Sequence, residues 1–287
     1  MDVSVVGAGR VGTAVAVLLR RAGHRIVAVS GRTATRERVA RFLPGVPVLG
    51  AGASAARADL TLIAVPDDAI AGAVAEIVSG DGVRPGAWVA HVSGASGLDV
   101  LEPVVEAGGR RLSVHPLQAF ADVDGAIELL PGSAAAVTAD DEEGFGLGER
   151  LARDLGARPF RLADAMRPRY HAAAVIASND LVVLSSVAER LFRDAGVPDP
   201  AAAMLPLQRA TLDNVERLGT TDALTGPAVR GDAHTIERNL TALAEVAPAA
   251  VPAYVALGRI ALELATAGGR LDPDARAQVE AVLARWT

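Results

Sequence analysis

Apolar residues follow two different spacings along this chain, and the change comes near residue 163. Before it, short apolar runs alternate with stretches in which apolar residues recur every three or four positions. Short runs are typical of buried strands and the wider spacing of amphipathic helices, so a doubly wound parallel sheet of the α/β class is predicted here. The predicted strands span residues 3–6, 24–30, 60–65, 87–92, 112–115, 134–138 and 158–162.

After residue 163 the strand pattern stops and long amphipathic helices follow. The chain is therefore predicted to contain two domains, residues 1–163 and 164–287, of which the second is all-helical. This second domain has more apolar surface than one small bundle would bury, so we expect it to bind substrate and to form a homodimer. Its predicted helices span residues 168–192, 201–218, 232–246, 251–267 and 274–286.

A glycine-rich turn follows the first predicted strand. Gly7, Gly9 and Gly12 have the G-x-G-x-x-G spacing, with Arg10 and Val11 between them, and a helical pattern comes directly after. The first glycine permits a tight turn, the second lets a pyrophosphate approach the backbone, and the third lets helix and strand pack closely. Free N–H groups at the helix start would receive the phosphates. These five residues are predicted to bind a dinucleotide in a Rossmann-type domain.

The end of the second predicted strand indicates which dinucleotide is bound. An NAD site usually has an acidic residue here, about 20 residues after the glycines, to hold the ribose 2′-hydroxyl. This chain instead has Ser30, Arg32 and Thr33 in the sequence S-G-R-T. Arginine can bind a 2′-phosphate through paired charged hydrogen bonds, whereas a carboxylate would repel it. The sequence therefore favours NADP.

Polar residues also follow the third and fourth predicted strands, at the edge where ligands of doubly wound sheets bind. Val65, Pro66 and Asp67 come after the third strand, near the expected nicotinamide ribose, although Asp67 is better explained as a helix cap. His91 and Ser93 share one face at the end of the fourth strand. Ser93 is a candidate hydrogen-bonding partner for the cofactor. His91 could transfer protons or be a core histidine bonded to backbone.

Four further residues are candidates for the chemistry. His115 precedes a proline at the end of a strand, which restricts its ring and favours a position facing the substrate. His171 and Ser178 lie about two turns apart in one predicted helix and so share a face, although Ser178 could also bond to another helix. Asn179 is the better candidate for orienting a substrate carbonyl or carboxylate.

Composition excludes several classes of function. The 287-residue chain has a net charge of -6, which argues against nucleic-acid binding, and no cysteine. All 28 basic Lys+Arg residues are arginine, so lysine chemistry is excluded. No metal-ligand spacing occurs, no apolar run reaches the length of a membrane helix, and no export signal is visible. We expect a cytoplasmic protein that acts on a small carboxylate without a metal or membrane.

Six short motifs together resemble a known family. They are G-A-G-R-V-G, V-P-D-D, H-V-S-G, S-V-H-P-L-Q-A-F, H-x6-S-N and L-T-G-P-x-x-R-G-D. The chain resembles bacterial Rossmann-like NADP oxidoreductases with a helical C-terminal domain of unknown function, a group that includes alternative ketopantoate reductases. In layout the group is similar to pyrroline-5-carboxylate reductase and 6-phosphogluconate dehydrogenase. The resemblance implies reduction of a small 2-oxo acid, with 2-dehydropantoate, reduced to pantoate, as the first candidate.

The proton donor differs from that of the related dehydrogenases. Those enzymes use a lysine that would fall at position 175, which is Val175 here. His171 is our hypothesis for the donor, with His115 and His91 as alternatives.

Three other functions remain open. The segment V-H-P-L resembles prephenate dehydrogenases, the N-terminal half resembles deazaflavin-linked NADP oxidoreductases, and the chain could be a non-catalytic NADP(H) sensor.

Overall fold

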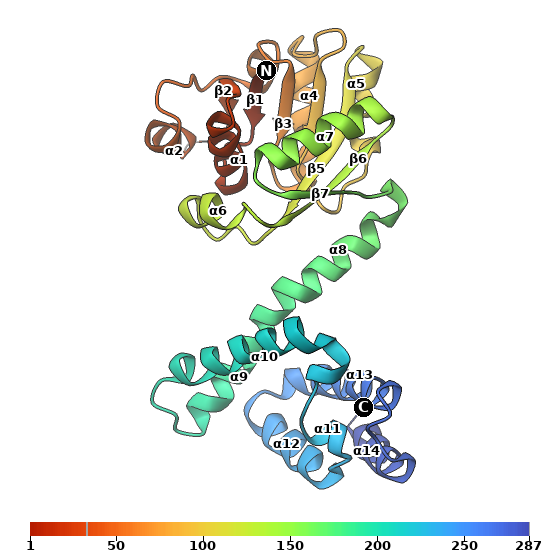
Figure 1. Ribbon diagram of the computed structural model, residues 1–287. Coiled ribbons are helices and arrows are strands. Elements are labelled where there is room, and N and C mark those ends of the chain that lie inside the picture. Colours follow the sequence, from red (N-terminus) through yellow and green to blue (C-terminus); the bar gives the residue numbers. More distant parts are fainter. Residues whose placement is uncertain (33, 287) are drawn as a thin grey trace. The chain divides into compact units, whose positions relative to one another are not determined.

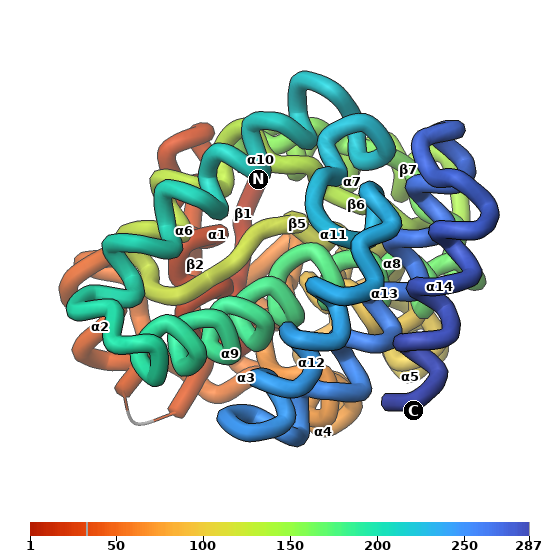
Figure 2. The backbone as a smooth tube through the Cα atoms, turned by 90° about the horizontal axis from the view of Figure 1, so that it is seen from below, coloured from red at the N-terminus to blue at the C-terminus, as the bar shows by residue number. Residues whose placement is uncertain are grey.

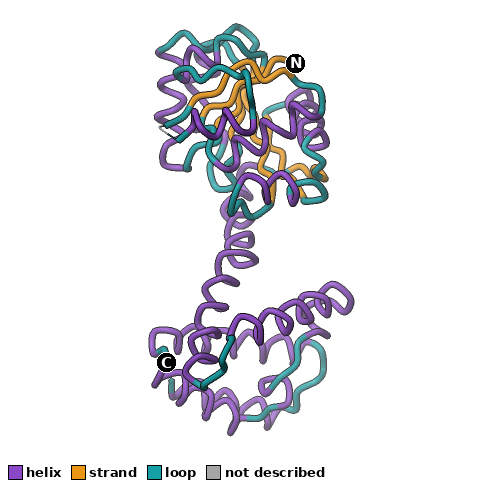
Figure 3. Tube along the Cα trace, turned by 90° about the vertical axis from the view of Figure 1, so that its left-hand side faces the viewer, coloured by secondary structure: helices purple, strands orange, loops and turns teal. Residues whose placement is uncertain are grey.

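The computed structural model describes residues 1–32 and 34–286, which divide into two compact units, Met1–Ser178 and Asn179–Thr287. Strands occur in the first unit, and the described part of the second is built from helices and their connections (Figure 3). The sequence boundary was drawn at residue 163, where the strands end. The first unit also contains the next helix, α8 (Arg167–Val175), because a buried arginine at its start bonds to the sheet.

The first unit is built on a seven-stranded sheet in the order β2-β1-β3-β4-β5-β6-β7. Neighbouring strands are parallel except β5 and β6, which are antiparallel. A parallel sheet was expected throughout. The residue opposite Leu117 at the end of β5 is Ala134 at the start of β6, so the connection begins and ends at the same edge. The strands are β1 (Asp2–Val6), β2 (Arg25–Ser30), β3 (Leu60–Ile63), β4 (Trp88–His91), β5 (Arg110–Leu117), β6 (Ala134–Ala139) and β7 (Arg158–Arg161).

Helices cover both faces of this sheet (Figure 1). One apolar core contains residues of α1 (Arg10–Arg21) and α7 (Glu142–Asp154) and the other contains residues of α4 (Ile70–Ser79). The apolar faces of α1, α4 and α7 are buried against the sheet, and this burial stabilises the fold. The structure describes four further short helices in this unit. These are α2 (Thr35–Phe42), α3 (Ala51–Ala55), α5 (Glu102–Glu106) and α6 (Val123–Leu129).

Six α-helices form the described part of the second unit (Figure 2). Its core contains the buried side chains of Leu240, Leu262 and Leu283, contributed by α12, α13 and α14. Helix α10 packs against α9 and is kinked at Gly219, whose backbone is left-handed. The helices are α9 (Leu181–Asp194), α10 (Pro200–Ala223), α11 (Pro227–Arg230), α12 (Ala233–Val246), α13 (Val251–Ala267) and α14 (Pro273–Arg285).

The long helix predicted over residues 168–192 is interrupted. A π turn, Ile176–Asp180, separates α8 from α9. Because a π turn is wider than an α turn, it changes the angular spacing that placed His171 and Ser178 on one face.

Two helical stretches of the described chain are long and apolar enough to cross a membrane, Asp164–Asp194 and Pro248–Ala267. The sequence has no uninterrupted apolar run of membrane-helix length, and these two stretches qualify by length and mean hydropathy instead. Core helices of soluble proteins pass the same test, so the finding alone is weak evidence for a membrane.

Candidate functional site

A pocket of about 570 Å³ lies where β1 turns into α1. The turn is tight, because Gly7 has a φ of +95° and a Cβ atom there would lie 2.6 Å from the carbonyl oxygen of Ala64. At Gly12 a Cβ atom would lie 2.3 Å from the carbonyl oxygen of Gly7. Helix and strand can therefore approach this closely only if both residues are glycine. The amides of Gly7 and Ala8 both donate to the carbonyl oxygen of Ser30, at 2.9 Å, which joins the turn to the end of β2.

Gly9 differs from these two glycines. The nearest atom to a Cβ there is the carbonyl oxygen of Gly7, at 4.0 Å, and the φ of Gly9 is -78°. The folded chain alone does not require glycine at this position. Among the described residues, no side chain caps α1 and none in its first turn is acidic. The helix start can therefore receive an anion, and the space beside Gly9 fits the pyrophosphate of a dinucleotide.

Basic side chains lie at the β2 end of the pocket. Ser30 and Arg32, two of the predicted cofactor residues, line it, and Arg32 is exposed. Arg38 also lines it and donates from Nη1 to the carbonyl oxygen of Ala8, at 2.8 Å, so it fixes the glycine turn. Arg38 is not among the predicted cofactor residues, because hydrogen bonds to a turn leave no sequence pattern. Thr33, also predicted to bind the cofactor, lies outside the described residues.

The remaining predicted cofactor residues divide between pocket and core. Val65 and Pro66 line the pocket after β3. Arg10 is exposed at the first position of α1, and Val11 packs against the core beneath. The prediction that Asp67 caps the next helix was wrong. Among the described residues no side chain caps this start, because the chain enters α4 through a 3-10 turn, Asp67–Ala69.

His91 holds the loop after β4. Its Nδ1 atom is 3.2 Å from the amide nitrogen of Ser93 and its Nε2 atom is 3.2 Å from the carbonyl oxygen of Gly97. The amide can only donate, so Nδ1 accepts and Nε2 carries the proton. Burial, helped by the Arg167 cation, lowers the pKa of His91 to about 4. Ser93 Oγ in turn accepts from the amides of Ala95 and Ser96. Of the two roles left open by the sequence, this geometry supports the structural one.

His115 lies on the part of β5 that continues past the end of β4, since β4 ends opposite Ser113. Its Nδ1 atom is 2.7 Å from the hydroxyl oxygen of Tyr170, on α8. Burial lowers the pKa of His115 to about 4, with the Arg167 cation as the next cause. Burial also raises the pKa of Tyr170 to about 12. At neutral pH the pair is therefore an uncharged imidazole and a protonated phenol.

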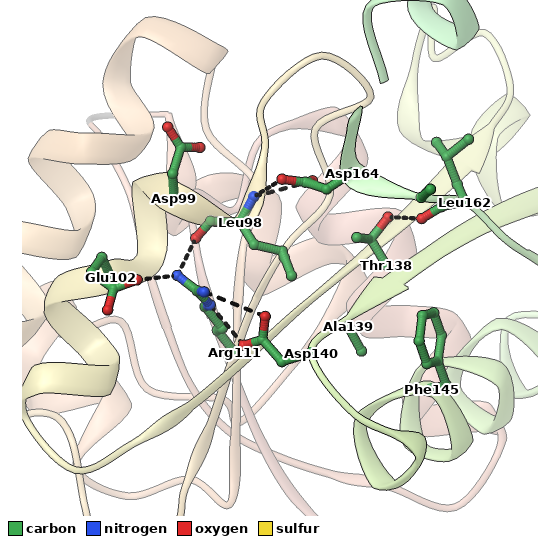
Figure 4. Close-up of a pocket in the computed structure, with 11 residues that line it drawn as sticks. Leu98, Asp99, Glu102, Arg111, Thr138, Ala139, Asp140, Phe145, Leu162 and Asp164 are labelled. Atoms are coloured by element: carbon green, nitrogen blue, oxygen red, sulfur yellow. Dashed lines mark hydrogen bonds and ion pairs between the residues drawn. The ribbon is translucent and has the colours of Figure 1, made fainter. Parts of the chain in front are cut away.

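Arg167 connects these parts. Its side chain is 1 % exposed, and it donates to Ser93 O at 3.0 Å and to Thr138 Oγ1 at 3.0 Å. Its Nε atom donates to Asp164, at 2.9 Å, and the same carboxylate accepts from the amide of Leu98. Figure 4 shows Asp164 and Thr138 beside a smaller pocket. Nothing in the sequence pattern marked Arg167 as buried.

The smaller pocket of Figure 4 has a structural explanation. Its volume is about 270 Å³, and Arg111 pairs there with Asp140 and Glu102 and donates to the carbonyl oxygen of Leu98. The two carboxylates and the arginine therefore satisfy one another. No group of acidic, histidine or cysteine residues in the described part of the chain could hold a metal ion.

The other predicted catalytic residues lie further along the chain. His171 follows Tyr170 and is partly buried, with an Nδ1 atom that has no hydrogen-bond partner among the described residues. Ser178 and Asn179 are exposed in the π turn, and Asn179 is the first residue of the second unit. Their roles stay predictions.

Two known families match the chain. A Rossmann-like domain matches residues 1–116, and the domain of unknown function DUF2520 matches residues 133–261. The chain therefore combines a Rossmann-like N-terminal domain with a DUF2520 C-terminal domain. No curated protein matches the chain.

Solved structures share its fold over almost its whole length. A Bacteroides fragilis protein named "putative NADP oxidoreductase" is 27% identical, with a TM-score of 0.76 over 91% of this chain and 98% of that one. An imine reductase from Pseudomonas sp. is 21% identical (TM-score 0.66; 98% of each chain). One from Myxococcus stipitatus, in complex with NADP+, is 16% identical (TM-score 0.67; 100% and 99%). The chain thus has the fold and two-domain layout of NADP-dependent oxidoreductases.

Proposed function

We propose that this protein is an NADPH-dependent reductase of a small 2-oxo acid, with 2-dehydropantoate as the first candidate. The main support for a bound dinucleotide is the open space at Gly9, which a side chain could fill without meeting the folded chain. The arginines after β2 select NADP over NAD by their charge. Bound NADPH would supply a hydride to the substrate.

The substrate class rests on different support. The six sequence motifs resemble a group that includes ketopantoate reductases, and the Bacteroides fragilis neighbour is named as an NADP oxidoreductase. The two imine reductases share the fold, which makes a cyclic imine a useful second class of test substrate. Imines and ketones both need a hydride at carbon and a proton at the neighbouring atom.

The decisive experiment follows the near-ultraviolet absorbance of NADPH with 2-dehydropantoate, other 2-oxo acids and a cyclic imine. We expect turnover with at least one 2-oxo acid and at most slow turnover with NADH. NADPH binding without turnover of any carbonyl would contradict the proposal and favour a sensor. NADP reduction by prephenate, or only with a deazaflavin, would favour the other two oxidoreductase classes.

Gly9→Ala tests the proposed cofactor site separately from the stability of the fold. Because the nearest protein atom to a Cβ there, the carbonyl oxygen of Gly7, is 4.0 Å away, the variant should fold with unchanged stability. Its methyl group would occupy the pyrophosphate space, so we expect NADPH to bind at least about tenfold more weakly, a change of about 1.4 kcal/mol. Unchanged NADPH binding would place the cofactor elsewhere.

We also propose that two copies associate through the helical unit. Helices α9 and α10 expose Val182 (68 %), Val183 and Leu207, and a cavity of about 690 Å³ between α9, α12 and α13 is lined mainly by apolar side chains. Such a surface is typical of a protein-protein interface. Sedimentation at several concentrations tests this, and a monomer at micromolar concentration would contradict it.

A further inference from the structure

We propose that Tyr170 donates the proton in the reduction and that His115 positions its hydroxyl group. This inference rests on the proposed function and assigns one of its steps to a residue that the sequence did not single out. It differs from the hypothesis that the neighbouring His171 is the donor.

Three contacts fix the phenol of Tyr170. Its hydroxyl oxygen lies 2.7 Å from Nδ1 of His115. The His115 and Tyr170 rings meet edge to face, with centroids 5.5 Å apart and an interplanar angle of 87°. The ring of Phe160 also contacts Tyr170, with centroids 5.9 Å apart. A side chain held by a hydrogen bond and two rings loses little further freedom when it binds a substrate.

The phenol lies at the ligand-binding edge of the sheet. Its partner, the His115 ring, rests against Gly94 in the loop after β4, where a Cβ atom would come within 2.8 Å of Cε1 and Nε2. β3 and β5 are parallel neighbours of β4, so the segment after β3, with the pocket residues Val65 and Pro66, leaves the sheet at the same edge. A dinucleotide in a doubly wound sheet runs toward such an edge.

The protonation states suit a donor. The phenol is protonated at neutral pH, because burial raises its pKa. The Arg167 cation acts in the opposite direction on this pKa, so it would stabilise the phenolate that forms when the proton leaves. His115 is neutral, and its Nδ1–H can donate to the phenol oxygen while the phenolic hydrogen turns to the substrate. A neutral His115 and a cationic Arg167 are both already in place before the reaction.

The step balances in atoms and electrons. A hydride from NADPH forms the new C–H bond at the carbonyl carbon, and the π electron pair of the C=O bond moves to oxygen. Tyr170 gives its proton to that oxygen, so a phenolic O–H bond breaks and an alcohol O–H bond forms. The substrate is reduced and the cofactor oxidised. The phenolate then takes one proton from water.

Tyr170→Phe is the principal variant and Tyr254→Phe its control, since the chain has two tyrosines and Tyr254 lies in the helical unit. We expect Y170F to lower kcat about 100-fold or more, with NADPH affinity changed less than about twofold. Y254F should match the wild type. An active Y170F would overturn the proposal, whether or not His171→Gln is inactive. A wild type that binds NADPH but reduces no carbonyl would remove the proposed function itself.

The positioning role of His115 has to be tested by a measurement that a purely structural role would leave unchanged. We expect His115→Ala to lower kcat about tenfold, and His115→Asn, which keeps an N–H near the position of Nδ1, to recover part of the loss. Equal kcat in H115A and the wild type would overturn the positioning role.

A second readout does not need turnover. In Y254F the one remaining phenol should show little phenolate absorbance up to about pH 10.5, because its pKa is near 12. In Y254F/H115A the absorbance should rise earlier, since the hydroxyl group is then hydrated. Ordinary titration near pH 10 in Y254F itself would overturn the proposal.

Discussion

Acid should destabilise the sheet-bearing unit through His91 and His115. His91 is buried and His115 is half-buried, both as neutral rings, and desolvation lowers each pKa from 6.5 to about 4. Below pH 6.5 the unfolded chain binds protons that the folded chain does not. The free energy of unfolding therefore falls as the pH drops from about 6.5 to about 4, and no further loss from these groups follows below that.

The size of the effect follows from the two pKa values. At pH 5 each histidine lowers the free energy of unfolding by about 2 kcal/mol relative to pH 7, because one pKa unit corresponds to about 1.4 kcal/mol. Together they remove about 4 kcal/mol of the roughly 5–15 kcal/mol that stabilises a typical domain. Protonating His91 also removes the acceptor of the Ser93 amide, so the loop after β4 should loosen first.

Urea unfolding at pH 7 and pH 5 measures this loss. The chain has two tryptophans, so Trp286→Phe leaves Trp88, in β4, as the reporter of this unit. In that background His115→Asn should reduce the loss between the two pH values by about 2 kcal/mol, while the carboxylates contribute equally to both proteins. If the pH dependence is the same with and without His115, the ring is not buried in neutral form and the reasoning fails.

Three further outcomes are expected. Arg32→Ala should weaken NADPH binding about tenfold or more and leave NADH binding unchanged, because a charged hydrogen bond contributes about 1.5–3 kcal/mol. Arg36→Ala is the control, and its NADPH affinity in the same titration should change little. Gly12→Ala should lower the free energy of unfolding by about 1–3 kcal/mol in urea, because its Cβ would collide with the turn. Val182→Asp should shift sedimentation toward a monomer, whereas Leu129→Asp, at a residue of the first unit that is also exposed (55 %, against 68 % for Val182), should not.

The regular part of the fold could be predicted from the sequence. Each predicted strand of the first unit is present. Most are buried and need a continuous apolar run, which the sequence shows, whereas the edge strand β7 is mostly exposed and has the mixed sequence R-P-F-R. The reversal of β6 could not be predicted, since an apolar run carries no direction. The π turn at Ile176–Asp180 was also missed, because its composition is that of an ordinary helix.

The candidate site could be predicted only where a local sequence motif places its residues. The glycines, Ser30 and Arg32 lie together because a local motif places them. Tyr170 lies 55 residues from His115 along the chain, and a hydrogen bond over that separation depends on how α8 meets the sheet. Arginines usually face solvent and tyrosines are intermediate in burial, so neither Arg167 nor Tyr170 gave a local signal.

Gly9 and Gly12 belong to one motif, yet a mutational screen should separate them. In a library selected only for soluble, protease-resistant protein, small residues should accumulate at position 9 and not at position 12, because a Cβ collides with the chain at Gly12 alone. A second selection for retention on an immobilised nucleotide should then remove the position 9 variants. The difference between the two surviving populations would map which backbone atoms serve the ligand and which serve the fold.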